Sequence, residues 1–436
     1  MTGISADPYW WQAAPPRDFH IDTWPEHADV VIIGGGYTGF GAAIPLARAG
    51  LDVVMLERDQ IGSGASTRNG GITSGNLRLS FENLVKRFGA EKAAAFFQEA
   101  KAARADLAQF ITSEKIDCDL QQCGRLVGAL RRESLDSMKR DAERLTKLLD
   151  IEATVYDQNN LPDYIDTSRY CGGMMRNDIG GIHPAKLLAG MCQIARAASV
   201  KIATQTKMIA VSQQSKASPT HGFFVETSRG IIHAGHVISA TNAYTDEGQP
   251  WLRRRLVPVI SEMIATEELG ANMVRSLMPG LNMYGEALQL GHYYRSSPDG
   301  KRILLGGRRM SSDPAKARKR LMKGLTSIFP QLADITISNH WFGFVAFPFD
   351  QLPKLAVHDG VIYPSGYCGS GTVWARWLGQ KAAHMVLADL DESEFQGSAF
   401  QGVPFRTMPF YSGDPWFLPL AMGLYAIQDK FKTTSK

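Results

Sequence analysis

The stretch that most constrains this chain lies near its N-terminus, where ADVVIIGGGYTGFGAA runs from an apolar segment into closely spaced glycines. The apolar run predicts a buried strand over residues 28–33, and the residues that follow predict a helix over 37–50. Gly34, Gly36 and Gly39 lie between and within these elements with GxGxxG spacing. A glycine-rich turn between a strand and a helix is therefore the first structural unit that we expect.

An acidic residue completes this unit. The segment LDVVMLE predicts a second strand that ends at Glu57, about twenty residues after the glycines. In such a unit the glycines make the tight turn and let a pyrophosphate approach the backbone, while the acid accepts hydrogen bonds from ribose hydroxyls. We interpret the unit as a dinucleotide site, with an ordinary glycine turn as the alternative, and the motif does not distinguish FAD from NAD.

Composition limits the class of protein. A chain of 436 residues with 44% apolar and 21% charged residues is long enough for two or three folded domains, and a net charge of +4 gives no case for nucleic-acid binding. The five cysteines are scattered without disulfide or metal-ligand spacing, so we expect reduced thiols and no metal site. The N-terminus lacks a signal-peptide pattern, and no apolar run is long enough for a transmembrane segment. We expect a cytoplasmic protein.

The remaining pattern changes along the chain. Apolar residues at helical spacing predict helices over 91–111 and 133–149, and strand signals dominate after about residue 200. Asp299 and Gly300 predict the turn of a β-hairpin. This succession predicts an α/β domain that is interrupted by a second domain.

Six stretches of the chain resemble one known family. They are VIIGGGYTGFGAA, IGSGASTRNGG, GGIHPAKLLAG, VISATNAYT, YYRSSPDGKRILLGG and PSGYCGSGT. In this order and spacing they resemble the FAD-dependent D-amino acid oxidase (DAO) family, and most closely its γ-glutamylputrescine oxidoreductase branch. The glycine- and hydroxyl-rich loop at residues 61–75 is the part that favours FAD over NAD.

The resemblance implies an α/β fold with an α+β two-domain organisation. A Rossmann-like FAD-binding domain of the glutathione-reductase/DAO type would be interleaved with a substrate domain built on a mainly antiparallel sheet. We expect the FAD-binding domain at 29–90, 150–245 and 345–395, the substrate domain at 91–149 and 246–344, an N-terminal extension at 1–28, and a C-terminal extension with a helix at 396–436.

The resemblance also implies non-covalent FAD and a set of residues that bind it. Gly34, Gly36, Thr38 and Gly39 would hold the pyrophosphate, Glu57 and Arg58 the adenosine half, and the backbone of Met208 would face the adenine. Ala240 and Thr241 would lie at a strand end over the cofactor. The matching positions along the ribityl chain and the flavin ring are Ser66, Thr67, Arg68, Asn69, Gly70, Gly71, Ile72, Gly369, Ser370, Gly371 and Thr372. The last four would form a helix N-terminus whose N–H groups face the N1–C2=O edge of the flavin.

The implied activity is oxidation of the C–N bond of an amine, such as γ-glutamylputrescine or another primary or secondary amine. Hydride transfer to flavin N5 would give an imine and then an aldehyde, with oxygen or another acceptor reoxidising the flavin. Two alternatives stay open: a D-amino acid or N-methyl amino acid oxidase or dehydrogenase, and a flavin-binding scaffold or assembly protein without turnover. The oligomeric state cannot be read from the sequence.

Candidates for the substrate site carry no assigned catalytic role. They are Arg308, Arg309, Tyr293, Tyr367, Trp341 and Ile72. Because an amine must be neutral to lose hydride, we expect an apolar, aromatic pocket with one cationic anchor, supplied by Arg308 or Arg309.

Three departures from the family pattern lie on the substrate side. Ile72 stands where the branch has a glutamine, and Cys368 and Ser370 replace a serine and a histidine. We interpret Cys368 as a packing residue rather than a flavin attachment site, and His183 as structural. The role of Glu286 stays open.

Overall fold

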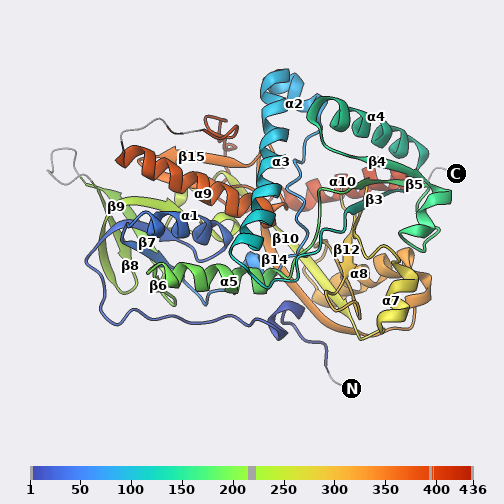
Figure 1. Ribbon diagram of the computed structural model, residues 1–436, viewed down its shortest axis with the longest axis horizontal. Coiled ribbons are helices and arrows are strands. Elements are labelled where there is room, and N and C mark those ends of the chain that lie inside the picture. The colour runs from blue at the N-terminus through green and yellow to red at the C-terminus, as the bar shows by residue number, and fades with distance from the viewer. Residues whose placement is uncertain (1–2, 215–221, 392–394, 396, 434–436) are drawn as a thin grey trace.

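The computed structural model describes residues 3–214, 222–391, 395 and 397–433, and places them in two lobes, each built on one eight-stranded sheet (Figure 1). In the first sheet, five parallel strands follow the order β16-β9-β1-β2-β6, with β15 antiparallel at one edge and the β7–β8 pair joined to β9. Its strands are β1 (His27–Ile33), β2 (Val53–Leu56), β6 (Lys201–Ala203), β7 (Met208–Gln213), β8 (Phe223–Thr227), β9 (Gly230–Ser239), β15 (Lys354–His358) and β16 (Val361–Ser365).

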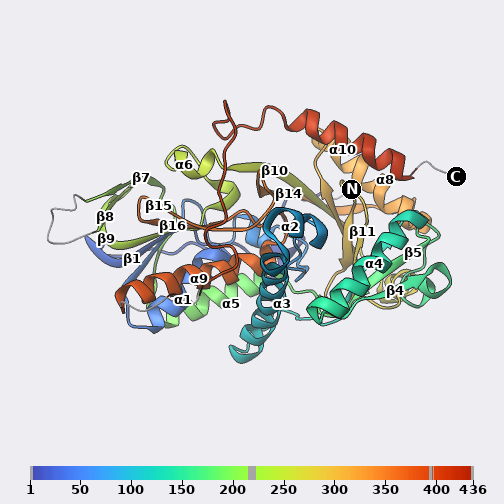
Figure 2. The ribbon, with the colours of Figure 1, turned by 90° about the horizontal axis from the view of Figure 1, so that it is seen from above.

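Both faces of this parallel sheet are covered, which explains the continuous apolar run in β1. Side chains alternate between faces along a strand. Val30 and Ile32 therefore pack into the core that contains the helices, whereas Val31 and Ile33 pack with β7, β8 and β9. Figure 2 shows three of these helices side by side below the sheet. They are α1 (Tyr37–Arg48), α5 (Pro184–Ala197) and α9 (Gly371–Leu390).

The second sheet has the order β14-β10-β13-β12-β11-β3-β5-β4, and only the β11–β3 pair is parallel. Its strands are β3 (Arg125–Ala129), β4 (Thr154–Asp157), β5 (Gly172–Arg176), β10 (Leu256–Thr266), β11 (Met283–Glu286), β12 (Tyr293–Ser296), β13 (Ile303–Arg308) and β14 (Ile337–Pro348). The long strands β10 and β14 pair along nearly their whole length, and their residues enter the cores of both lobes. They connect the two sheets.

The other helices lie around these sheets. The α-helices are α2 (Phe81–Phe88), α3 (Ala90–Ser113), α4 (Arg132–Leu149), α6 (Pro250–Arg253), α7 (Ala271–Leu277), α8 (Pro314–Ile328) and α10 (Leu418–Thr433). The 3₁₀ turns are η1 (Tyr9–Gln12), η2 (Ala65–Thr67), η3 (Gln158–Asp163), η4 (Asn242–Tyr244) and η5 (Pro330–Leu332). The expected helices at 91–111 and 133–149 are present as α3 and α4, and the expected hairpin joins β12 to β13, with Gly300 at φ +70° in its turn.

The packing departs from the expected domain boundaries in two places. Strands β4 and β5 pair with β3 in the second sheet, although we expected residues 150–245 in the FAD-binding domain. Helix α3, expected in the substrate domain, buries Phe96 and Leu107 in the core of the first lobe. A periodic apolar pattern predicts a helix or a strand, but it does not say which sheet that element packs against.

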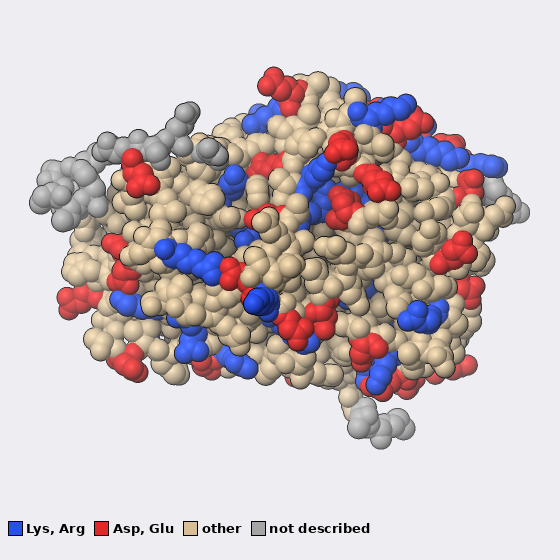
Figure 3. Space-filling model, viewed as in Figure 1, with Lys and Arg blue, Asp and Glu red and all other residues tan. Residues whose placement is uncertain are grey.

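Charged side chains of both signs are mixed on the surface that faces the viewer in Figure 3, without a large area of one sign. Within the part of the chain that the structure describes, no helix is both long enough and apolar enough to cross a membrane.

Candidate functional site

The glycine turn after β1 has the geometry that its sequence predicts. Gly34 has φ +109°, and its N–H donates to the carbonyl of Leu56 at 2.8 Å, which ties the turn to β2. A Cβ at Gly39 would overlap the carbonyl oxygen of Gly34, so α1 approaches the turn as closely as its backbone allows. The α1 N-terminus is thereby fixed at the carboxyl ends of β1 and β2.

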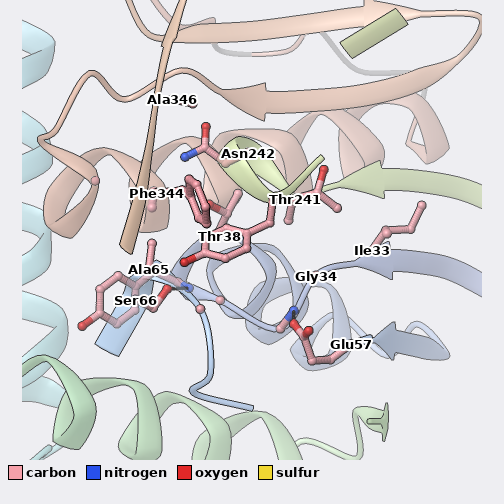
Figure 4. Close-up of a pocket in the computed structure, with 18 of the residues that line it drawn as sticks. Ile33, Gly34, Thr38, Glu57, Ala65, Ser66, Thr241, Asn242, Phe344 and Ala346 are labelled. Carbon is pink, nitrogen blue, oxygen red and sulfur yellow. Dashed lines mark hydrogen bonds between the residues drawn. The ribbon is translucent and has the colours of Figure 1, made fainter. Parts of the chain in front are cut away.

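A long cavity opens at these strand ends. Its lining comes from the glycine turn, the ends of β2 and β9, the loop at 62–69, the middle of β14 and the start of α9. Figure 4 shows Glu57 and Gly34 near one end, Thr38 and Ser66 in between, and Phe344 and Ala346 toward the other end. The carboxyl edge of a parallel sheet, where such cavities form, is the usual ligand site of this architecture.

Two helix N-termini face this cavity. Gly36 and Ser370 are the N-cap residues of α1 and α9; Gly36 has no side chain, and the Ser370 side chain does not cap α9. The hydroxyl of Ser370 donates instead to the carbonyl of Asn76 at 2.9 Å. In α1 the N–H of Tyr37 donates to Ser66 Oγ at 3.0 Å. Free N–H groups and a positive dipole end favour phosphate oxygens and other electron-rich acceptors, so the cavity offers two places for them.

Glu57 provides a hydrogen-bond acceptor at the end of the cavity that is remote from Phe344 and Ala346. Its carboxylate accepts hydrogen bonds from the N–H of Gly35 at 2.9 Å and the N–H of Asp59 at 3.0 Å. Burial raises the pKa of Glu57, and these two hydrogen bonds oppose the increase. Arg58 lines the cavity too, but its guanidinium also pairs with Asp246 at 3.6 Å. An acid held at this strand end suits the hydroxyls of a ribose.

The glycines of the turn are packed against the neighbouring wall of the cavity. A Cβ at Gly36 would lie 2.9 Å from Ser66 Oγ, and one at Gly34 would lie 3.0 Å from the carbonyl oxygen of Ala240. Both positions therefore require glycine for packing, and both line the cavity with backbone, which a pyrophosphate can approach closely.

Most residues that the sequence assigned to the cofactor line this cavity. They are Gly34, Gly36, Thr38, Glu57, Arg58, Ser66, Asn69, Met208, Ala240, Thr241, Gly369, Gly371 and Thr372. The sequence did not single out Ala65, Asn242 or Phe344, which line it as well. Asn242 directly follows Thr241 in the SATNAYT motif, so this motif could have identified Asn242 as a cavity residue.

The other predicted cofactor residues lie elsewhere. Gly39 packs inside the turn, the Thr67 hydroxyl donates to the carbonyl of Gly62, and a Cβ at Gly71 would overlap the carbonyl oxygen of Ile182. Four further residues line a second cavity instead. They are Arg68, Gly70, Ile72 and Ser370.

This second cavity, of about 350 Å³, meets the first between the two lobes. Its walls come from the loop at 65–78 and from β3, β10, β13, β14 and the segment 286–293. Seven residues line both cavities: Ala65, Asn69, Phe344, Val345, Cys368, Gly369 and Thr372. We call this shared region the junction.

Three of the six substrate-site candidates line the second cavity: Ile72, Tyr293 and Arg308. Tyr367 lines the first, with its hydroxyl between Thr38 Oγ1 at 2.8 Å and the carbonyl of Pro364 at 2.7 Å.

Arg309 and Trp341 line neither cavity. Arg309 forms an ion pair with Glu262, because successive residues of a strand point to opposite faces and Arg308 already faces the cavity. Trp341 is buried in a core cluster and donates through Nε1 to the carbonyl of Arg68 at 2.9 Å. Neither residue is placed to contact a substrate.

The expectation of an apolar pocket with one cation is wrong. Arg78, Arg125 and Arg308 all line the second cavity, and Glu286 is the one carboxylate in its lining. Arg78 and Arg125 carried no motif that pointed to a site. Arg125 comes from β3 and Arg78 from the loop that precedes α2, so the two reach the cavity from segments far apart in the sequence.

Glu286 is a structural anion. It accepts hydrogen bonds from Arg169 Nε at 2.6 Å and from both the N–H and Nδ1 of His292, at 2.9 Å and 2.7 Å. Burial alone would raise the pKa of this carboxyl, but the hydrogen bonds and charge of His292, with the charge of Arg169, lower it to about 2. It stays ionised near neutral pH and has no proton to exchange with a substrate.

His183 and Cys368 both form hydrogen bonds within the protein. His183 caps α5, accepting from the N–H of Lys186 at 3.2 Å, and burial lowers the pKa of its ring to about 4. The thiol of Cys368 donates to the carbonyl of Gly366 at 3.2 Å, and burial raises its pKa to about 12. A thiol that stays neutral is a poor nucleophile.

A parallel sheet with a glycine turn, joined to an antiparallel sheet around two connected cavities, defines a two-domain flavoprotein oxidoreductase architecture. The family model described as "FAD dependent oxidoreductase" (DAO) matches residues 29–385. The chain belongs to this DAO family of FAD-dependent oxidoreductases, and FAD is its cofactor.

Individual relatives agree with this placement. The chain is 29% identical over 371 residues to γ-glutamylputrescine oxidoreductase of Escherichia coli K12, covering 83% of this chain and 84% of that one. It is 29% identical over 435 residues to the probable oxidoreductase OrdL of Rhizobium meliloti, covering 98% and 99%. Among solved structures, glycine oxidase from Geobacillus kaustophilus has a TM-score of 0.71 at 19% identity over 88% of this chain and 99% of that one, which shows the shared fold.

Proposed function

We propose that this chain oxidises the C–N bond of an amine, γ-glutamylputrescine or another primary or secondary amine, to an imine that hydrolyses to an aldehyde. FAD, when bound, supplies the acceptor for the hydride that leaves the carbon next to nitrogen. The observation that carries the proposal is the junction, where a cavity suited to a dinucleotide opens into a second cavity of a size suited to a small molecule. The similarity to γ-glutamylputrescine oxidoreductase of E. coli supports the choice of an amine.

The charges around the second cavity suit an amine that must lose its proton before it reacts. An alkylamine has a pKa near 10.4, and its deprotonation at pH 7 costs roughly 4–5 kcal/mol. Nearby positive charges disfavour the ammonium form, and Arg308 lies at the junction, where a Cβ at Gly369 would be 3.0 Å from its Nη2. In this proposal, electrostatic repulsion replaces the apolar surroundings that we expected from the sequence.

We also propose that FAD is held non-covalently, by Glu57 at the ribose, the α1 N-terminus at the pyrophosphate and the α9 N-terminus at the flavin edge. The buried Cys368 thiol, with its raised pKa and its hydrogen bond to Gly366, supports non-covalent binding. The electron acceptor in this proposal is oxygen or another oxidant.

A second candidate is oxidation of a D-amino acid or an N-methyl amino acid. In such a substrate the carboxylate is attached to the reacting carbon or, when an N-methyl group reacts, to the other carbon on the same nitrogen, so it would lie at or next to the junction. Arg308 is a cation at that place, and this favours the second candidate as the alternative.

Anaerobic flavin reduction tests the proposal. The FAD-loaded protein is mixed without oxygen with γ-glutamylputrescine, other polyamine derivatives, D-amino acids and N-methyl amino acids, and the flavin absorbance is followed. We expect bleaching by γ-glutamylputrescine or a related amine. Bleaching by α-amino acids alone would favour the second candidate, and no bleaching by any compound would favour a flavin-binding scaffold without turnover.

A further inference from the structure

Four arginines line the second cavity without an ion pair to a carboxylate in the described part of the chain: Arg68, Arg78, Arg125 and Arg308. The guanidinium of Arg68 is already bound to backbone carbonyls, which leaves Arg78, Arg125 and Arg308 as the three cavity arginines. Glu286, the carboxylate of the lining, is already bound by Arg169 and His292. The cavity therefore keeps an excess of positive charge.

Neighbouring charged groups do not remove this excess. Arg68 lines the same cavity, but its guanidinium donates to the carbonyls of Ser63 and Phe342. Asp178 is shared by two arginines outside the lining, Arg104 and Arg176, so it is not available to the three cavity arginines.

Arg125 lies against the second sheet. It comes from β3, and its guanidinium lies over Gly285 of the parallel neighbour β11, where a Cβ would be 2.7 Å from Nη2. Its Nε is buried without a hydrogen-bond partner. Burial, together with the charges of Arg176 and Arg78, lowers the pKa of Arg125 to about 10, so it is still charged at neutral pH. A buried, charged donor without an acceptor is costly unless a ligand supplies one.

The three arginines have an order relative to the junction. Arg308 lies beside Gly369 of the junction, whereas Arg125 contacts Gly285 in the second sheet. The exposed Arg78 lies between them, because its charge acts on Arg125, on Arg308 and on the junction residue Cys368. A substrate that reaches from the junction past Arg308 would therefore pass Arg78 and meet Arg125 at its far end.

We infer that Arg125 and Arg78 form an anion-binding subsite for the end of the substrate remote from the reacting C–N bond. Guanidinium groups bind carboxylates through paired, charge-assisted hydrogen bonds. The substrate class is then amines that carry a carboxylate several bonds from the oxidised carbon, in contrast to α-amino acids, whose carboxylate would lie at Arg308. This inference rests on the proposed function, which it narrows.

Binding of an unreactive anion tests the subsite without turnover. Glutarate and its neutral diamide, glutaramide, are titrated into the FAD-loaded protein by calorimetry. We expect the wild type to bind glutarate at least 10-fold more tightly than glutaramide, and Arg125→Gln and Arg78→Gln to lose roughly 10- to 100-fold in glutarate affinity. Arg275→Gln, at an exposed arginine of α7, serves as the control and keeps wild-type affinity. Equal binding of glutarate and glutaramide, or unchanged affinity in both cavity variants, would overturn the subsite.

A kinetic comparison separates the subsite from the proposed function. We expect Arg125→Gln to lower kcat/KM roughly 10- to 100-fold for γ-glutamylputrescine, which has a remote carboxylate, and to leave N-acetylputrescine, which has none, within about twofold. If both amines reduce the flavin and both respond equally to the substitution, the subsite is wrong and amine oxidation stands. If neither amine reduces the flavin while glutarate binding depends on Arg125, amine oxidation is wrong and the subsite stands. Arg78→Gln, at an exposed position, repeats the comparison should Arg125→Gln not fold.

Discussion

At the scale of single residues, the charged groups of the second cavity have two roles. The carboxylate of Glu286 stabilises the fold, whereas the arginines are available to bind a ligand. Glu286 is fully enclosed by Arg169, His292 and neighbouring groups, and its charge stabilises the walls. Arg125 and Arg308 face the same space without a carboxylate partner in the described residues. The chemistry of the cavity follows from this difference, because a charge that is already paired contributes little to ligand selection.

The depressed pKa of Glu286 predicts a defined acid sensitivity. Its pKa is about 2 in the folded protein and 4.5 in the unfolded chain, so unfolding takes up a proton between these values and stability falls as the pH drops from about 4.5 toward 2. The difference corresponds to roughly 3 kcal/mol. We expect Glu286→Gln to be less stable than the wild type by about that amount at pH 7, measured by chemical denaturation, with the gap closing below pH 4.5.

A matched control for this prediction is Glu82→Gln, at an exposed ion pair with Arg144. Exposed pairs contribute about 0–1 kcal/mol, so this variant should track the wild type at every pH. If the gap between Glu286→Gln and the wild type did not change with pH, the ionised state that we describe for Glu286 would be incorrect.

At the scale of elements, the C-terminal helix α10 supports the second cavity although it does not line it. Asp429 of α10 accepts hydrogen bonds from the N–H groups of Gln289 at 2.9 Å and Leu290 at 2.7 Å. Leu288 and Gln289 belong to the cavity wall, so α10 holds that wall in place. The opposite side of the helix leaves apolar side chains exposed, among them Leu420 and Leu424.

This contact predicts a positioning role for Asp429. Asp429→Asn keeps one acceptor and loses the charge, which weakens two charge-assisted hydrogen bonds to the 289–290 backbone. We expect KM for the amine substrate to rise roughly 3- to 10-fold, with kcat within about twofold, because the junction is untouched. Gln428→Ala, at the exposed neighbouring position, should leave both constants unchanged. A 3- to 10-fold loss in kcat with no change in KM would show that Asp429 does not act through the cavity wall.

At the scale of the whole molecule, the sequence predicted what neighbouring residues determine and missed what the sheet order determines. The β1–glycine–α1 unit and the β12–β13 hairpin depend on residues close in the chain, and both are present as expected. The arginine cavity depends on segments far apart in the sequence: Arg125 of β3 and Arg308 of β13 share one sheet through β11 and β12, and Arg78 reaches the cavity from a loop. The same limit explains why β4 and β5 were expected in the wrong lobe.

The cofactor site was predictable to a greater extent than the substrate site for the same reason. Its residues lie in short, ordered motifs at strand ends, such as Gly34–Gly36 and Ala240–Thr241. The substrate-side arginines come from surface loops and strand positions where a charged residue is ordinarily solvent-exposed. Sequence alone gave no reason to choose Arg125 over any other arginine.

The central claim is that FAD lies along the first cavity and that its reactive ring reaches the junction with the second. A crystal structure of the FAD-loaded protein tests this most directly. We predict the adenosine ribose within hydrogen-bond distance of the Glu57 carboxylate, the pyrophosphate at the N-terminus of α1, and the flavin ring at the junction near Asn69 and Gly369. A flavin ring placed away from the junction, with the second cavity closed off from it, would contradict the account.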